Sequence, residues 1–210
     1  SKKGIACLLA VVISALMLPV SVFAAEYDQD IDVTADDYTD REGYTWDSAT
    51  NTLTLTNVTL TGDGTGKGIL LPQGKVTIVL EGENIIQDFS EGFAQKNSSS
   101  TKGNSLEIKG SGSLTVSQCN YMSSGSFEDV TVDGVKLVGD NTNGLVMNGN
   151  FVAKNGAYID LSVADGNNNA WNPIYANGNI EIYDSTFISH SGATGGIWAV
   201  GVGKDSSLLK

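Results

Sequence analysis

The sequence repeats one short pattern: apolar and polar residues alternate, and a turn residue follows. The phrase NTLTLTNVTL at residues 51–60 is the first example. Counted from their first apolar residues, the phrases begin at Leu53, Val76, Leu106, Val130, Phe151 and Ile180. The spacings are 23, 30, 24, 21 and 29 residues. A period in this range predicts a solenoid, in which each repeat forms one turn and loops of variable length enter at the corners.

Each repeat contains three short alternations. The first ends in a residue that enters the left-handed region at low cost, which predicts a sharp corner. These corner residues are Asn57, Gly82, Gly110, Gly134, Asn155 and Asp184. The second alternation is predicted to point inward at Leu60, Ile85, Leu114, Leu137, Ile159 and Phe187. The third has the form Gly-apolar-x-apolar, as in GILL from Gly68, and often leads to a glycine corner at Gly74, Gly149 or Gly178.

Runs of period two are typical of half-buried strands. Three strands per repeat in a fixed order predict an all-β fold, a parallel β-helix of about six rungs. With about 4.8 Å per rung, the stack would be roughly 29 Å tall. Leu53 and Leu55 would fill its interior, while the threonines between them cover the outside. An antiparallel β-sandwich is the alternative, and the recurring order of strands and corners argues against it.

Three segments are expected. Residues 1–24 are typical of a secretory signal peptide, because Lys2 and Lys3 precede an apolar run that is short for a membrane span of about 20 residues. Residues 25–50 form an acidic N-terminal leader and cap, in which GYTWDSATNTLTL predicts a hairpin that starts the stack. Residues 51–210 form the β-helix. The chain stops directly after a third-strand phrase, so we expect it to be truncated at the C-terminus.

The charge limits the partners. The formal net charge is -12, and loss of Lys2 and Lys3 with the signal peptide would make it -14. Such a chain repels nucleic acid and anionic membranes, and it repels acidic glycans unless a cation bridges the two. After cleavage we expect a secreted protein, extracellular or at the cell surface, without membrane contact. Cys119 would then be the only cysteine, which predicts a buried apolar side chain and no intrachain disulfide.

The third strand offers a candidate carbohydrate site. Its outward positions are predicted to form an apolar stripe of Leu70, Ala94, Met122, Val146, Tyr175 and Trp198. Tyr175 and Trp198 on adjacent rungs, with Trp171 close in sequence, would stack sugar rings as a ladder. The alternative is that a loop or a second copy covers the stripe, since exposed apolar patches usually mark a contact.

The first strand offers a candidate calcium site. Lys109, Asp133 and Lys154 are predicted to follow one another on its outer side, with Glu107 in the next column. Calcium on Glu107 and Asp133 with a lysine base would suit a polysaccharide lyase. A surface ladder of alternating charge is the other interpretation. Asp28, Asp30 and Asp32 alternate as well, which would put three carboxylates on one face of a strand, although a solvated acidic leader explains them equally simply.

Three phrases resemble a known family: GYTWDSATNTLTL, GILLPQGKVTIVLEGENII and YANGNIEI. They are similar to those of the secreted carbohydrate-binding β-helix proteins of anaerobic Gram-positive bacteria, a pectate-lyase-like family whose characterised type is a calcium-containing, polygalacturonate-binding surface protein. The resemblance covers most of residues 44–200 and rests on structural phrases, so no binding residue carries over. It implies a right-handed coil, an extracellular setting and a pectic or cell-wall glycan as ligand.

The sequence therefore predicts a secreted, non-catalytic carbohydrate-binding β-helix protein that recognises cell-wall or pectic polysaccharide, with calcium as its one candidate cofactor. Two alternatives remain. One is a calcium-dependent polysaccharide lyase. The other is a structural adhesin or assembly segment that associates with itself through the apolar stripe.

Overall fold

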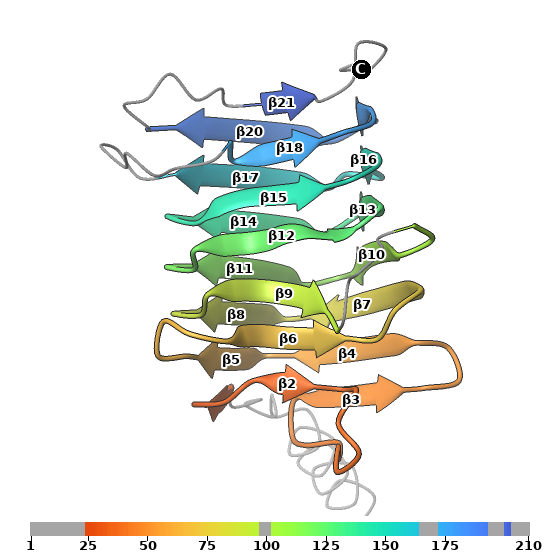
Figure 1. Cartoon of the computed structure of the whole chain (residues 1–210), viewed down its shortest axis with the longest axis vertical. Coiled ribbons are helices and arrows are strands. Elements are labelled where there is room, and N and C mark those ends of the chain that lie inside the picture. Colours follow the sequence, from red (N-terminus) through yellow and green to blue (C-terminus); the bar gives the residue numbers. More distant parts are fainter. Residues whose placement is uncertain (1–23, 97–101, 164–171, 193–199, 203–210) are drawn as a thin grey trace, which may run out of the picture.

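The chain forms a parallel β-solenoid. The computed structural model describes residues 24–96, 102–163, 172–192 and 200–202, and each regular element within these ranges is a strand (Figure 1). Three seven-stranded sheets run the length of the stack, and from β4 onward consecutive strands visit them in turn. Six triplets result, from β4–β5–β6 to β19–β20–β21, with about five complete turns between the first and the last. The coil is right-handed, and the fold class predicted from the sequence is confirmed.

The bounds of the strands are as follows. The first sheet consists of β3 (Tyr44–Asp47), β4 (Thr52–Thr56), β7 (Lys75–Glu81), β10 (Ser105–Gly110), β13 (Asp129–Asp133), β16 (Phe151–Lys154) and β19 (Ile180–Ile182). The second consists of β1 (Ala25–Tyr27), β5 (Val58–Thr61), β8 (Glu83–Gln87), β11 (Ser113–Ser117), β14 (Lys136–Asp140), β17 (Tyr158–Val163) and β20 (Thr186–Ser191). The third consists of β2 (Ile31–Asp32), β6 (Lys67–Leu71), β9 (Glu91–Gln95), β12 (Tyr121–Phe127), β15 (Asn143–Met147), β18 (Ile174–Ala176) and β21 (Val200–Val202).

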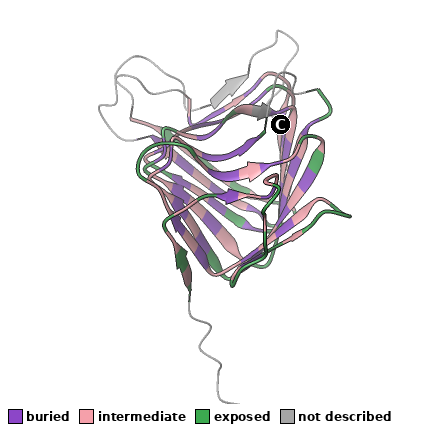
Figure 2. Ribbon diagram, turned by 60° about the horizontal axis from the view of Figure 1, so that its bottom comes forward, coloured by how far each residue is buried: buried purple, intermediate pink, exposed green. Residues whose placement is uncertain are grey.

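The core is a set of apolar columns inside the coil. Ile78 of β7 pairs in register with Leu53 below it and Ile108 above it, and all three side chains are fully buried. Buried and less buried positions alternate along the strands (Figure 2). The threonines that alternate with Leu53 are only half-buried and face outward. Burying one such apolar side chain contributes about 1.5–3 kcal/mol, and most of that burial comes from the neighbouring turns. Several turns must therefore stack before any one of them is stable.

Positive φ angles mark the corners. All six residues predicted between the first and second sheets have them, from 45° at Asp184 to 126° at Gly110. A second set between the second and third sheets was not predicted: Asp88, Gln118 and Asn141, with φ of 60°, 53° and 49°. Among the predicted third corners Gly74 has a φ of 97°. Gly149 and Gly178 are there for a different reason, since a Cβ on either would lie within 2.8 Å of backbone atoms of the turn below.

One predicted core position is wrong. Ile85 faces outward and is half-buried, while Asn84 and Ile86 point into the interior at 1% exposure. The register explains it, because Leu60 pairs with Ile86 and Thr59 pairs with Ile85. Asn84 is tolerated in the interior because its side-chain amide is fully hydrogen-bonded. Its Oδ1 accepts from the Val58 backbone N–H at 3.0 Å, and its Nδ2 donates to the carbonyls of Glu81 and Ser113.

The N-terminal segment closes one end of the stack. β1 pairs with β5 and β2 pairs with β6, both parallel, and β3 forms the expected antiparallel hairpin with β4. Tyr44 of β3 is buried, and its ring meets that of Tyr27 edge-on with centroids 5.4 Å apart. Within the ranges described above, no helix has the length and apolarity needed to cross a membrane.

Candidate functional site

The outer side of the third sheet, whose strands run across the front of Figure 1, carries most of the features expected of a ligand-binding surface. We name part of it the tyrosine face and define it by six residues. They are Tyr121, Ser124, Val146, Asn148, Tyr175 and Asn177. β12, β15 and β18 supply them or the turn residues directly after them, so the face spans three consecutive turns.

The apolar stripe predicted on this side is interrupted. Ser124, not Met122, stands beside Val146, and Met122 is fully buried in the core. β12 is longer than its neighbours and shifts register between Ser124 and Phe127, so the uniform spacing assumed from the sequence does not apply there. Ala94 is also fully buried. Polar groups therefore divide the stripe into separate apolar positions.

Tyr175 lies where predicted, and so does Val146 below it, but the neighbour above differs. On the turn below it pairs with Val146, and on the turn above with Gly201 rather than Trp198. Because glycine has no side chain, the next turn places no side chain from this register position against the ring. Trp171 and Trp198, the other two predicted sugar-binding residues, lie outside the described residues.

Amide side chains hold Tyr175 in place. Its hydroxyl donates to Asn177 Oδ1 at 3.2 Å, and Asn177 Nδ2 donates to Asn148 Oδ1 on the turn below at 3.3 Å. Asn148 Nδ2 in turn donates to the Gly125 carbonyl at 3.0 Å. This ladder links three turns and fixes the orientation of the ring. The sequence analysis predicted glycine corners at the adjacent Gly149 and Gly178 and gave Asn148 and Asn177 no role, although the tripeptide NGN recurs at 148–150 and 177–179 and pointed to stacked amides.

Two ion pairs lie on the same sheet, on the N-terminal side of the tyrosine face. Lys67 Nζ lies 3.5 Å from Glu91 Oε2, and Glu91 Oε1 accepts a hydrogen bond from the Ser124 hydroxyl. Lys96 Nζ lies 3.9 Å from Asp32 Oδ2. The side chain of Glu91 is only 12% exposed, so its charge is well shielded from water and held against the lysine. Each of these two lysines thus has an acidic partner within 4 Å.

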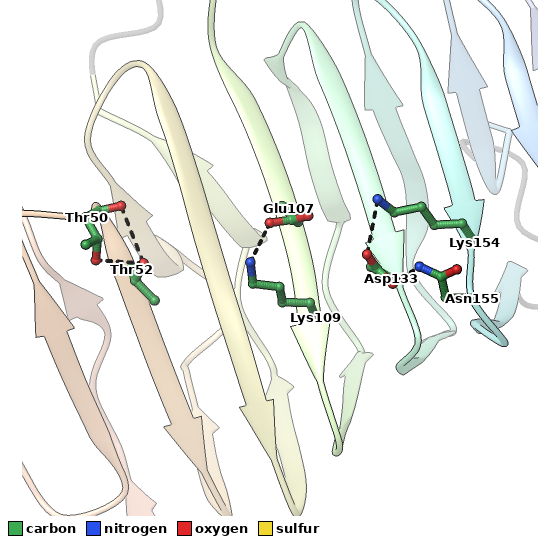
Figure 3. A network of polar contacts seen from close by, with 7 residues as sticks. All are labelled: Thr50, Thr52, Glu107, Lys109, Asp133, Lys154 and Asn155. Carbon is green, nitrogen blue, oxygen red and sulfur yellow. Dashed lines mark hydrogen bonds and ion pairs between the residues drawn. The ribbon is translucent and has the colours of Figure 1, made fainter.

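The first sheet carries the predicted ladder of charge (Figure 3). Asp133 pairs in register with Lys109 on one side and Lys154 on the other, as expected. Lys154 Nζ lies 3.1 Å from Asp133 Oδ2, and Asn155 Nδ2 donates to Asp133 Oδ1 at 2.7 Å. The Asn155 hydrogen bond, followed by the hydrogen bond and charge of Lys154, holds the pKa of Asp133 below its usual value.

The two candidate calcium ligands are not in the same column. Glu107 pairs in register with Thr131, and its Oε2 lies 2.9 Å from Lys109 Nζ. Glu107 and Asp133 thus face lysines rather than each other (Figure 3). The described part of the chain contains no group of three or more His, Cys, Asp or Glu side chains arranged to hold a metal ion.

The alternating aspartates near the N-terminus do not share a strand face. Asp28 and Asp30 lie in the bend between β1 and β2, and Asp32 lies in β2 itself. Asp28 and Asp30 line an open cleft of about 510 Å³ together with Asp63 and Phe89. Asp32 accepts hydrogen bonds from the backbone N–H and hydroxyl of Thr34 instead.

Cys119 is buried as predicted, at 4% exposure, and its Sγ donates to the Ser117 carbonyl. Burial raises the pKa of its thiol. Because the thiolate is the reactive form, both effects make this cysteine a packing residue rather than a nucleophile.

Comparison of the chain with protein-family models, with curated proteins and with solved structures found no match in any of the three.

Proposed function

We propose that the chain is a secreted, non-catalytic carbohydrate-binding protein that holds cell-wall or pectic polysaccharide on the tyrosine face. The observation that carries the proposal is the ladder from Tyr175 through Asn177 to Asn148. A sugar ring offers apolar C–H groups on its faces and hydroxyls at its edges. An aromatic ring with a few fixed polar groups beside it matches both.

The rigidity of the ladder supports binding. An aromatic side chain that is already held in one orientation loses little conformational entropy when a ligand stacks on it. The position of Gly201 adds to this, since the residue in register with Tyr175 on the next turn is a glycine. The resemblance to secreted carbohydrate-binding β-helix proteins points to the same ligand class.

Affinity electrophoresis tests the proposal. The protein would be run in gels that contain cell-wall or pectic polysaccharides, with calcium or with a chelator, and Tyr175→Ala would be compared with Tyr158→Ala. Tyr158 is the matched control, a half-buried tyrosine on the outer side of the second sheet. Tyr175→Ala should lose about 1–3 kcal/mol of binding, the range for an aromatic ring stacked on a ligand ring, and Tyr158→Ala should lose none. Equal retardation of both variants would contradict the assignment.

The same samples address the alternatives. In one assay, the protein is incubated with pectic substrate and calcium, and the absorbance of unsaturated products is followed. An absorbance that grows with time, and no longer grows in Lys109→Ala or Lys154→Ala, would identify a lyase instead. Both lysines are engaged in ion pairs in the unliganded chain, so a lyase would first have to release one of them. Concentration-dependent association that Tyr175→Ala abolishes would favour the assembly role.

A further inference from the structure

We infer that the tyrosine face selects an uncharged polysaccharide chain and binds it without calcium. This rests on the proposed function and narrows it, because a polyuronate and a neutral glycan make opposite demands on the charges around the site.

The lysines of the neighbouring turns of this sheet, β6 and β9, are paired with acids. Lys67 lies against Glu91, and Lys96 lies against Asp32. A uronate carboxylate would have to compete with Glu91 or Asp32 for a lysine, and it would bring a second negative charge close to the first. Like charges at such distances repel, and here the whole chain adds a net charge of -12 to the repulsion. An uncharged glycan meets neither cost.

The groups on the face itself are neutral. They comprise two phenol rings, a serine hydroxyl, an apolar valine and two amides. Hydroxyls and amides exchange hydrogen bonds with sugar hydroxyls without burying a charge, which avoids the large desolvation penalty of an ion. Selectivity for an uncharged ligand therefore follows from the side chains present.

A ligand that contacts both tyrosines would be a chain rather than a single sugar. Tyr121 pairs with Asn143 and Tyr175 pairs with Val146, so the two tyrosines lie two turns apart along the axis and three residues apart along the strands. With about 4.8 Å between turns and about 3.3 Å per residue, their Cα atoms are roughly 14 Å apart on the diagonal. A ligand that contacts both must extend over several sugar rings.

The experiment compares a charged polymer with its uncharged ester and with an uncharged polymer of a different sugar. Affinity gels would contain polygalacturonate, its fully methyl-esterified form, or hydroxyethyl cellulose, each with calcium or with a chelator. We expect retardation by the methyl-esterified polymer or by hydroxyethyl cellulose, equal in both buffers, and at least about tenfold weaker binding to polygalacturonate. Calcium-dependent retardation that is strongest in polygalacturonate would overturn this inference and leave the proposed function intact. No retardation in any gel would overturn both.

A charge variant tests the reason for the selectivity. Glu91→Gln keeps the shape and the acceptor for Ser124 but removes the partner charge of Lys67. The affinity for polygalacturonate relative to its methyl ester should then rise by up to about fivefold, the effect of one partly exposed charge pair. Glu107→Gln makes the same change on the first sheet and should leave the ratio as in the wild type. An unchanged ratio in Glu91→Gln, with a native circular-dichroism spectrum, would overturn the charge argument.

Discussion

Asn84 provides the sharpest test of how the turns are held together. Its amide links three consecutive turns: Oδ1 accepts from Val58 of β5, and Nδ2 donates to the Ser113 carbonyl of β11 at 3.1 Å. The residue is 1% exposed, so water cannot replace these bonds. We expect Asn84→Leu, which has similar volume, to destabilise the fold although it adds an apolar side chain to the core.

The magnitude follows from the bonds. Leaving the buried Val58 N–H without its acceptor costs about 1–3 kcal/mol, and each of the two carbonyls loses a bond worth about 0.5–1.5 kcal/mol. Burial of the leucine side chain returns about 1.5–3 kcal/mol. With mid-range values, the net loss is about 2 kcal/mol in the free energy of unfolding.

Equilibrium unfolding in urea, followed by far-ultraviolet circular dichroism, measures this loss. For a urea slope of about 2 kcal/mol per molar, a loss of 2 kcal/mol lowers the midpoint by about 1 M. The control is Ile85→Leu, which alters the adjacent outward side chain and should change the stability by less than about 0.5 kcal/mol. A midpoint for Asn84→Leu at or above that of the wild type would refute the reasoning, because apolar filling would then outweigh the three hydrogen bonds.

Two further predictions concern the corners and the charge ladder. Gly74→Ala should cost about 1–2 kcal/mol, since a Cβ there meets no atom within 4 Å and only the left-handed φ of 97° is strained. Gly112→Ala should cost more in the same urea assay, because its Cβ would lie 2.4 Å from the Gly82 carbonyl oxygen on the turn below. Asp133→Asn should cost about 0.2–1 kcal/mol at neutral pH through loss of the ion pair with Lys154. Because folding lowers the pKa of Asp133, this contribution is complete above the unfolded value of about 3.9 and is lost as the pH falls through the folded value. Unfolding curves recorded from pH 7 down to pH 3 should therefore converge, and a difference that grows on acidification would contradict the assignment.

The sequence was informative where one residue type decides the local geometry. Asn57, Gly134 and Asp184 were predicted as corners because few residues adopt positive φ, and all three do. The alternation of Leu53 and Leu55 with threonines likewise showed which side of β4 faces the core. These features depend on a residue and its chain neighbours alone, so the repeat and the solenoid could be derived without coordinates.

The candidate site was predicted less well, because it depends on the phase of one turn relative to the next. The phrase ENII at 83–86 has two isoleucines in a row, and alternation alone does not say which one points inward. Pairing with the turn below places the side chain of Ile86 in the interior, and this register also places the side chain of Asn84 there. In the same way, the register shift in β12 places Ser124, and not Met122, on the tyrosine face.

By itself, the sequence thus determined that the chain winds into stacked turns, where it bends between the first and second sheets, and which residues cover its regular strands, since local stereochemistry controls these features. Only the tertiary structure decided which residues stand beside one another across turns, such as Tyr175 with Gly201 or Glu91 with Lys67. Those contacts join residues more than twenty positions apart, and a shift of a single residue in register would replace every one of them.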